Sequence, residues 1–264
     1  MTRHTGEVWA VCAVPRSGGL SSLLATASDD ATVRMWDPAD GTPRGQPIKG
    51  HTGGVTAVCA VTNQGGRTLL ATGGTDERVR MWDPADGTPV GQPLRGHTDR
   101  VWAVCTVPGP EGRTLLATGG GDATVRLWDP TTGTPMGKPL TGHTGGVRAV
   151  CTVPGPEGRT LLATGGDDAT VRLWDPTTGT PMGKPLTGHT GGVEAVCPVP
   201  GPGDRTLLAT ASDDATVRVW DPVTRTPVRV FQVGIKVHAL CALTDGSLAI
   251  ATSEGVAVLV VRPV

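Results

Sequence analysis

Residues 143–188 read HTGGVRAVCTVPGPEGRTLLATGGDDATVRLWDPTTGTPMGKPLTG, and this stretch decides the fold. It holds apolar runs at 147–153 and 161–164, an alternating segment at 170–174 and a looser segment at 181–186. Turns rich in Gly, Pro, Asp and Thr separate these segments, and such turns suit hairpins rather than helical crossovers. The stretch therefore predicts four short antiparallel strands.

The same stretch recurs along the chain. Trp-Asp occurs at 36–37, 82–83, 128–129, 174–175 and 220–221, always 46 residues apart. Self-similarity at this period indicates one supersecondary unit stacked repeatedly, because each unit is too small to bury its own apolar face. The sequence divides into six units, at about 4–50, 51–96, 97–142, 143–188, 189–233 and 234–264.

Composition agrees with an all-β chain and limits its partners. The 264 residues include 39 Gly and 23 Pro but no Tyr and one Phe, with 38% apolar residues and a net charge of −1. Charges are spread along the chain, which argues against nucleic acid, and no polybasic or amphipathic segment suggests a membrane surface. The first residues carry no secretory signal, and no apolar stretch is long enough to span a bilayer. We expect a cytoplasmic protein, unless the chain was excised from a longer one.

With Gly-His, Trp-Asp and an Asp six residues before each Trp all in register, the chain resembles the WD-repeat β-propeller family over essentially its whole length. The resemblance implies an all-β fold: a single propeller over 1–264, with six four-stranded antiparallel blades. The last blade is expected to lack its outer strand. The alternative is part of a seven-bladed ring.

The resemblance also gives a structural role to a His, a Thr, an Asp and a Trp in each of five units. In the family these side chains form a hydrogen-bond chain inside each blade. Although a hydroxyl, an imidazole and a carboxylate also suggest a catalytic triad, an enzyme needs one reactive centre and this set occurs five times. The sets are His4/Thr26/Asp30/Trp36, His51/Thr72/Asp76/Trp82, His97/Thr118/Asp122/Trp128, His143/Thr164/Asp168/Trp174 and His189/Thr210/Asp214/Trp220.

Six cysteines recur at equivalent places in apolar runs and lack any Cys-x-x-Cys pair. Equivalent positions in different blades lie too far apart for disulfides, so we expect buried, reduced, inert thiols and no metal or cofactor. They are Cys12, Cys59, Cys105, Cys151, Cys197 and Cys241.

Differences between the units point to a partner surface. They concentrate just before and within the first strand and just before the network Asp; in the family these positions surround the channel mouth at the top face. Trp and Arg anchor interfaces disproportionately. The predicted partner-binding residues are Trp9, Trp102, Arg148, Glu194, Arg100, Asp29 and Asp167.

The sixth unit is degenerate. Ile235 replaces His, Glu254 falls where Asp is expected, and Val260-Val261 replaces Trp-Asp. The segment Val256–Val261 is expected to be an open apolar edge, available for self-association or strand addition. The ring closes by face packing alone, with a strand from a longer protein, or with one from another copy; we favour six blades with an imperfect seam.

The leading functional prediction is a non-catalytic scaffold that binds a protein or peptide at the top face. Two alternatives stay open. One is an enzyme at the channel mouth, for which Arg148, Glu194, Glu7 and His238 are the candidates; the other is a lectin-like glycan-binding module. The sequence does not identify the partner, the blade number or the oligomeric state.

Overall fold

The computed structural model describes residues 3–16, 21–62, 66–203, 205–243 and 246–259. The chain folds as two compact units, Met1–Pro139 and Leu140–Val264, which are described separately. Within the described residues every regular element is a strand or a short 3-10 turn, organised as six antiparallel sheets of three or four strands. This is the organisation of a β-propeller of about six blades, and it confirms the all-β prediction.

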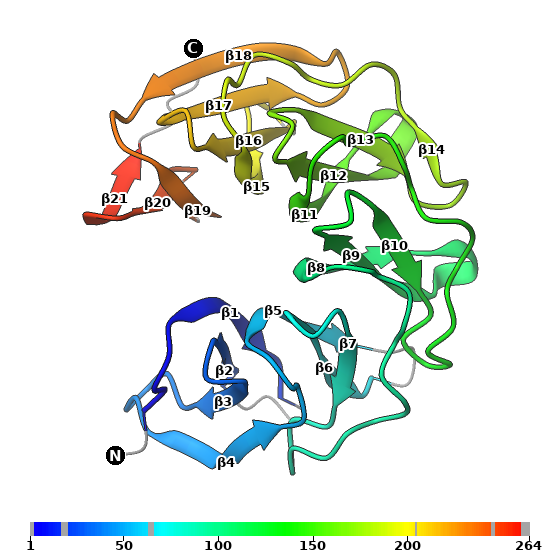
Figure 1. The fold of residues 1–264 in the computed structure, drawn as a ribbon. Coiled ribbons are helices and arrows are strands. Elements are labelled where there is room, and N and C mark those ends of the chain that lie inside the picture. The colour runs from blue at the N-terminus through cyan, green and yellow to red at the C-terminus, as the bar shows by residue number, and fades with distance from the viewer. Residues whose placement is uncertain (1–2, 17–20, 63–65, 204, 244–245, 260–264) are drawn as a thin grey trace. The chain divides into compact units, whose positions relative to one another are not determined.

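The first unit contains sheets 1 to 3 (Figure 1). Its elements are β1 (Val8–Val14), β2 (Leu23–Ser28), β3 (Thr32–Trp36) and β4 (Pro43–Lys49) in sheet 1; β5 (Val55–Thr62), β6 (Thr68–Gly74) and β7 (Val79–Trp82) in sheet 2; and β8 (Val101–Pro108), η2 (Pro110–Gly112), β9 (Thr114–Gly120) and β10 (Val125–Trp128) in sheet 3.

The second unit contains sheets 4 to 6. Its elements are β11 (Val147–Pro154), η3 (Pro156–Gly158), β12 (Thr160–Gly166), β13 (Val171–Asp175) and β14 (Thr180–Pro181) in sheet 4; β15 (Val193–Pro200), β16 (Thr206–Ser212), β17 (Thr216–Asp221) and β18 (Thr226–Gln232) in sheet 5; and β19 (Val237–Ala242), β20 (Leu248–Thr252) and β21 (Gly255–Leu259) in sheet 6.

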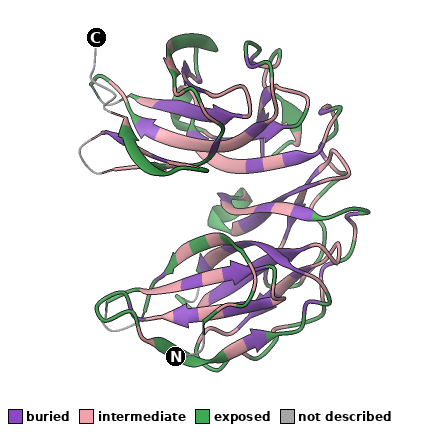
Figure 2. Cartoon of the chain, turned by 60° about the vertical axis from the view of Figure 1, so that its left-hand side comes forward, coloured by how far each residue is buried: buried purple, intermediate pink, exposed green. Residues whose placement is uncertain are grey.

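The apolar core lies between consecutive sheets rather than inside any one of them. Val33 and Ile48 of sheet 1 pack in one cluster with Val55, Leu70 and Trp82 of sheet 2. Figure 2 shows buried residues running along the strands, with exposed residues concentrated in turns and outer strands. Within each unit, neighbouring sheets thus bury each other's apolar faces, as the repeat predicts.

The fourth segment of the repeat forms a regular strand in three of the first five sheets. In the described residues sheets 2 and 3 have three strands, and their fourth segments make only isolated bridges such as Trp82↔Pro89 and Trp128↔Pro135. These segments hold two prolines, which lack an N–H, and a glycine at positive φ such as Gly91 (72°). Sheet 1 has the same pattern but completes β4 through a bulge between Val33 and Met35.

Sheet 6 keeps the register of sheet 5 with a tighter turn. Leu259 pairs with Leu248, as Trp220 pairs with Leu208 in sheet 5, so Leu259 stands at the Trp position. The proposed replacements Val260 and Val261 lie outside the described residues. Ile250 occupies the place of the network Thr, opposite Leu240. Val256 and Val258 on β21 are 78% and 55% exposed.

Among the described residues, none forms a helix of the length and apolarity needed to cross a bilayer.

Candidate functional site

The His, Thr, Asp and Trp of each set lie together in all five sheets where the sequence places them. In sheet 4, His143 Nδ1 lies 3.0 Å from Asp168 Oδ1 and His143 Nε2 lies 2.8 Å from Thr164 Oγ1. Trp174 Nε1 donates to the same hydroxyl oxygen at 2.9 Å. The other four sheets repeat these contacts at 2.7–3.0 Å. The imidazole, hydroxyl, carboxylate and indole N–H of each set therefore satisfy one another.

The threonine at the centre of each chain is closed off from solvent in sheets 2 to 5. Its side chain is shared between the imidazole and the indole, and it leaves no surface for a ligand to touch. The threonines that are 0% exposed are Thr72, Thr118, Thr164 and Thr210, whereas Thr26 of sheet 1 is half-buried. A buried hydroxyl cannot meet a substrate or partner while the sheet stays folded. These four threonines therefore cannot contact a ligand. Their burial argues against the catalytic triad that the same residue types suggest.

Burial and neighbouring charges fix the protonation states of the His and the Asp in the hydrogen-bonded sets. Burial lowers the pKa of His143, although the hydrogen bond and charge of Asp168 oppose that shift, so the imidazole is neutral. Burial would raise the pKa of Asp76, but the hydrogen bond and charge of His51 and the backbone N–H groups of Thr52 and Arg78 lower it to about 2. The carboxylate stays ionised and accepts from the His Nδ1–H.

One further residue of this arrangement was not identified from the sequence. An arginine stands two residues before each repeated Trp, and the network Thr hydroxyl lies 3.4–3.5 Å from its carbonyl oxygen. The charge of Arg172 adds to the lowered pKa of His143, and Arg80 Nη2 lies 3.5 Å from Asp76 Oδ2. The constant Val-Arg-x-Trp pattern is the signal that could have found it. The arginines are Arg34, Arg80, Arg126, Arg172 and Arg218.

The cysteines are less buried than expected. Five are half-buried and Cys241 is exposed, because its first strand β19 has fewer buried positions than those of the other sheets of its unit. Burial raises the pKa of Cys12 to about 11 and of Cys105 to about 12, so these thiols are protonated at neutral pH and weak nucleophiles. The described residues contain no group of three or more His, Cys, Asp and Glu that could hold a metal ion.

The three variable positions of each unit meet at one end of its sheet. The backbone N–H of the residue before the network Asp donates to the carbonyl of the residue before the first strand. These bonds join Asp29 to Glu7 at 2.9 Å, Thr75 to Gly54 at 2.9 Å, Gly121 to Arg100 at 2.8 Å, Asp167 to Gly146 at 2.9 Å and Asp213 to Gly192 at 2.9 Å. We call this end of each sheet its rim.

In the first unit the rim presents two tryptophans. Trp9 is 52% exposed on β1. Trp102 on β8 is half-buried, and the exposed Arg100 guanidinium lies 5.6 Å from its ring centroid, a cation–π contact. Thr56, at the corresponding place on β5, is buried with its hydroxyl against the Val101 carbonyl of the next sheet. In sheet 2 this position therefore has a structural role, because it links sheet 2 to sheet 3.

Variation at the rim is coupled between neighbouring sheets. A Cβ on Gly54 of sheet 2 would lie 2.3 Å from Asp29 Oδ1 of sheet 1, so a larger residue at Gly54 would displace the Asp29 side chain. In sheets 5 and 6, Lys236 Nζ binds Asp213 Oδ2 at 3.0 Å instead. Lys236 and Asp213 were not among the predicted site residues, although Lys236 stands two positions before His238 as Arg100 stands before Trp102.

In the second unit the rim is charged. Arg148 Nε donates to Asp167 Oδ1 at 2.8 Å, and both side chains are about one-third exposed. Burial raises the pKa of Glu194, Arg148 and His238 act against that shift, and Asp213 and Asp167 add to it. The structure thus brings together Arg148, Asp167 and Glu194 within this unit.

The repeat that builds these rims is also found in known proteins. The WD40 family model (WD domain, G-beta repeat) matches residues 1–37, 42–83, 87–129, 133–175 and 179–221. The chain belongs to the WD40 family. WD40 repeats typically mediate protein–protein interaction as scaffolds, and the matched segments include all five hydrogen-bonded sets. A comparison with curated proteins finds no match to the chain.

Proposed function

We propose that this WD40 protein is a non-catalytic, cytoplasmic scaffold that binds a protein or peptide at the top face, the rim ends of its sheets. One observation carries the proposal: Trp9 exposes half of its surface at a place where the buried Thr56 of sheet 2 serves the scaffold. A large indole gains nothing from exposure to water, whereas aromatic side chains dominate protein interfaces. Six free, mostly half-buried cysteines suit a reducing compartment.

The two units would contribute different chemistry to such binding. Trp9, Trp102 and Arg100 offer apolar area with a stacked cation. Arg148, Glu194 and Asp167 offer paired charges, which favour partner choice and association rate over affinity.

The test is capture of partners from cell lysate, identified by mass spectrometry. Trp9→Ala with Trp102→Ala should abolish capture while the melting temperature of the Trp9→Ala single variant stays at the wild-type value. Arg148→Ala should weaken capture of the same proteins. Val223→Ala is the matched control, because Val223 is equally exposed (52%) but lies in the turn between β17 and β18. Unchanged capture by the folded double Trp variant would refute the proposal.

A further inference from the structure

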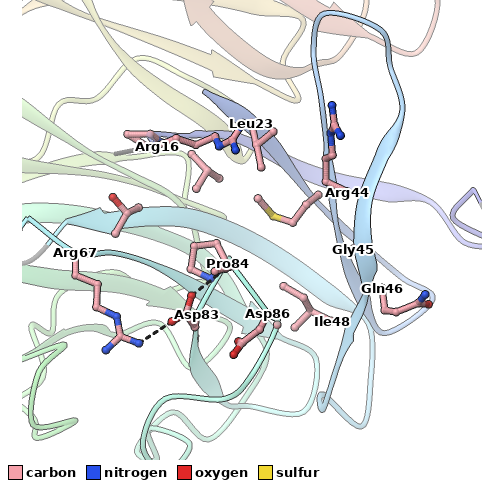
Figure 3. A pocket seen from close by; sticks show the side chains of 16 residues that line it. Arg16, Leu23, Arg44, Gly45, Gln46, Ile48, Arg67, Asp83, Pro84 and Asp86 are labelled. Carbon is pink, nitrogen blue, oxygen red and sulfur yellow. Dashed lines mark hydrogen bonds and ion pairs between the residues drawn. The ribbon is translucent and has the colours of Figure 1, made fainter. Parts of the chain in front are cut away.

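A groove of about 770 Å³ lies between sheets 1 and 2 of the first unit, away from the rims (Figure 3). Its apolar floor is the half-buried Leu23 above the buried Val14, Met35 and Ile48, and the turn 84–87 of sheet 2 forms one wall. Its volume falls within the range of ordinary ligand sites, which are mostly apolar with a few placed polar groups.

At this groove sheet 1 departs from the repeat at two positions, of which the first lies on β4. In each repeat a proline of the fourth segment lies opposite the repeated Trp, and the residue that follows this proline is Val90 in sheet 2 and Met182 in sheet 4. Both side chains pack against the apolar cluster that their sheet shares with the next one. In sheet 1 this residue is Arg44, whose Nη2 binds Asp37 Oδ2 at 2.6 Å. Leu23 beneath it is half-buried, whereas its counterparts Leu69 and Leu161 are 6% and 1% exposed.

A second substitution accompanies the first. In sheets 2 to 5 the Asp of Trp-Asp is paired with an arginine two residues before the second strand's leucine pair, from Arg67–Asp83 at 2.7 Å to Arg113–Asp129 at 4.0 Å. Sheet 1 has Ser21 at that place, and Arg44 supplies the missing cation from β4. The pair with Asp is therefore kept, while the apolar side chain that would fill the groove is lost.

The charged side chains at the groove indicate which charges a bound ligand would carry. Arg44 is paired with Asp37 and Arg67 with Asp83. Within the described residues Arg16 makes no ion pair or hydrogen bond, although its charge helps to lower the pKa of Asp37. Asp86 accepts from the N–H and hydroxyl of Thr88 and carries its charge without a cationic partner among the described residues. Figure 3 shows Arg16 beside Leu23, and Asp86 across the groove near Ile48 and Pro84.

We propose that this groove binds a short peptide in which an aliphatic side chain is flanked by an acidic residue on one side and a basic residue on the other. The aliphatic group covers the floor, the acid meets Arg16 and the base meets Asp86. A peptide fits better than a small metabolite because β4 is the outer strand of sheet 1 and offers its backbone along the groove at Gly45, where nothing lies near a Cβ position. The site is independent of the rims.

The probe is an immobilised array of peptides GDxLxKG with x varied, beside a control array GNxLxQG. Wild-type protein should select members of the first array, and selected peptides should bind about tenfold more weakly when their two charges are neutralised. If no member binds, the proposal fails.

The matched variant is Ser21→Arg with Arg44→Met, which copies the Arg159 and Met182 arrangement of sheet 4 and so should fold normally while filling the groove. It should lose at least about tenfold in affinity for the selected peptides at an unchanged melting temperature. Arg16→Gln should cost about threefold with the charged peptides and nothing with the neutral ones.

Equal selection by wild type and by the folded double variant would overturn the proposal. Both groove variants should retain lysate capture through the rims, and Trp9→Ala should retain the array selection. Failure of one site is therefore distinguishable from failure of the other.

Discussion

Sheets 5 and 6 are neighbours in the second unit, yet they are stabilised in different ways. In sheet 5, Thr210 links His189 to Trp220, and the indole is 2% exposed. At the same places sheet 6 has Ile250 and Leu259, and its third strand β21 leaves Val256 and Val258 exposed. The comparison teaches that the polar chain lets a third strand bury a large indole with its N–H satisfied, whereas the aliphatic third strand of sheet 6 leaves most of its side chains exposed.

Copying sheet 6 into sheet 5 should have the largest effect. Thr210→Ile leaves two buried nitrogens, His189 Nε2 and Trp220 Nε1, without their partner and adds bulk at a position with 0% exposure. We expect a loss of about 3 kcal/mol in the free energy of unfolding, measured by urea denaturation.

The reverse exchange, Ile250→Thr, is its control. It introduces a hydroxyl at a buried site whose sheet has no Trp at the facing position, so it should cost about 1–3 kcal/mol rather than stabilise. A gain in stability would show that sheet 6 still holds the elements of the polar chain.

The next largest effect is a dependence on pH that sheet 5 has and sheet 6 lacks. Burial opposes the shift, but hydrogen bonds from Thr216, Thr190 and His189 lower the pKa of Asp214 to about 2 in the fold, against an ordinary 3.8. Burial also lowers the pKa of His189 from its ordinary 6.5. Because both folded pKa values are depressed, their stabilisation is present above the unfolded values and is lost as pH falls, first below 6.5 and then from 3.8 towards 2.

Melting temperatures measured between pH 7 and pH 3 check this expectation. Asp214→Asn should be less stable than wild type at pH 7, and the difference should shrink as pH falls through 3.8. A difference that stays constant down to pH 3 would show that the carboxylate contributes no pH-dependent stabilisation.

The smallest effect concerns the turn between the second and third strands. Ala215 in the turn of sheet 5 has φ of 64°, in the left-handed region, whereas the shorter turn of sheet 6 has no counterpart of Ala215 and ends at Gly255, the pairing partner of Thr252, with φ of 133°. Ala215→Gly should raise stability by about 0.5 kcal/mol, because relief of strain slightly exceeds the entropy that a glycine loses on folding. Gly255→Ala should destabilise; thermal unfolding of the pair measures both signs.

The repeat made most of the fold predictable from the sequence. The first three strands of unit four were placed within a residue or two at each end, since apolar runs bounded by Gly and Pro define them. The fourth strands were not, because proline and positive-φ glycine break the ladder in some sheets while a bulge rescues it in sheet 1.

The rim residues were only partly predictable. Comparing the units found Trp9, Trp102 and Arg148, because these break the repeat. It could not show that Thr56 is buried against Val101, nor that Asp29 lies against Gly54, since those contacts join different sheets. The exchange of Ser21 and Arg44 was also missed, because the two positions are distant in sequence and only the structure shows that Arg44 pairs with Asp37.

The sequence by itself determined the all-β class and the repeat, because strand periodicity and turn chemistry are local and occur here five times in register. The four side chains of each hydrogen-bonded set came from the resemblance to the WD-repeat family that this repeat carries. Only the tertiary structure decided which variable residues are exposed, which are paired, and where a groove opens. Those properties depend on contacts between neighbouring sheets, where one side chain fills or empties the space left by another.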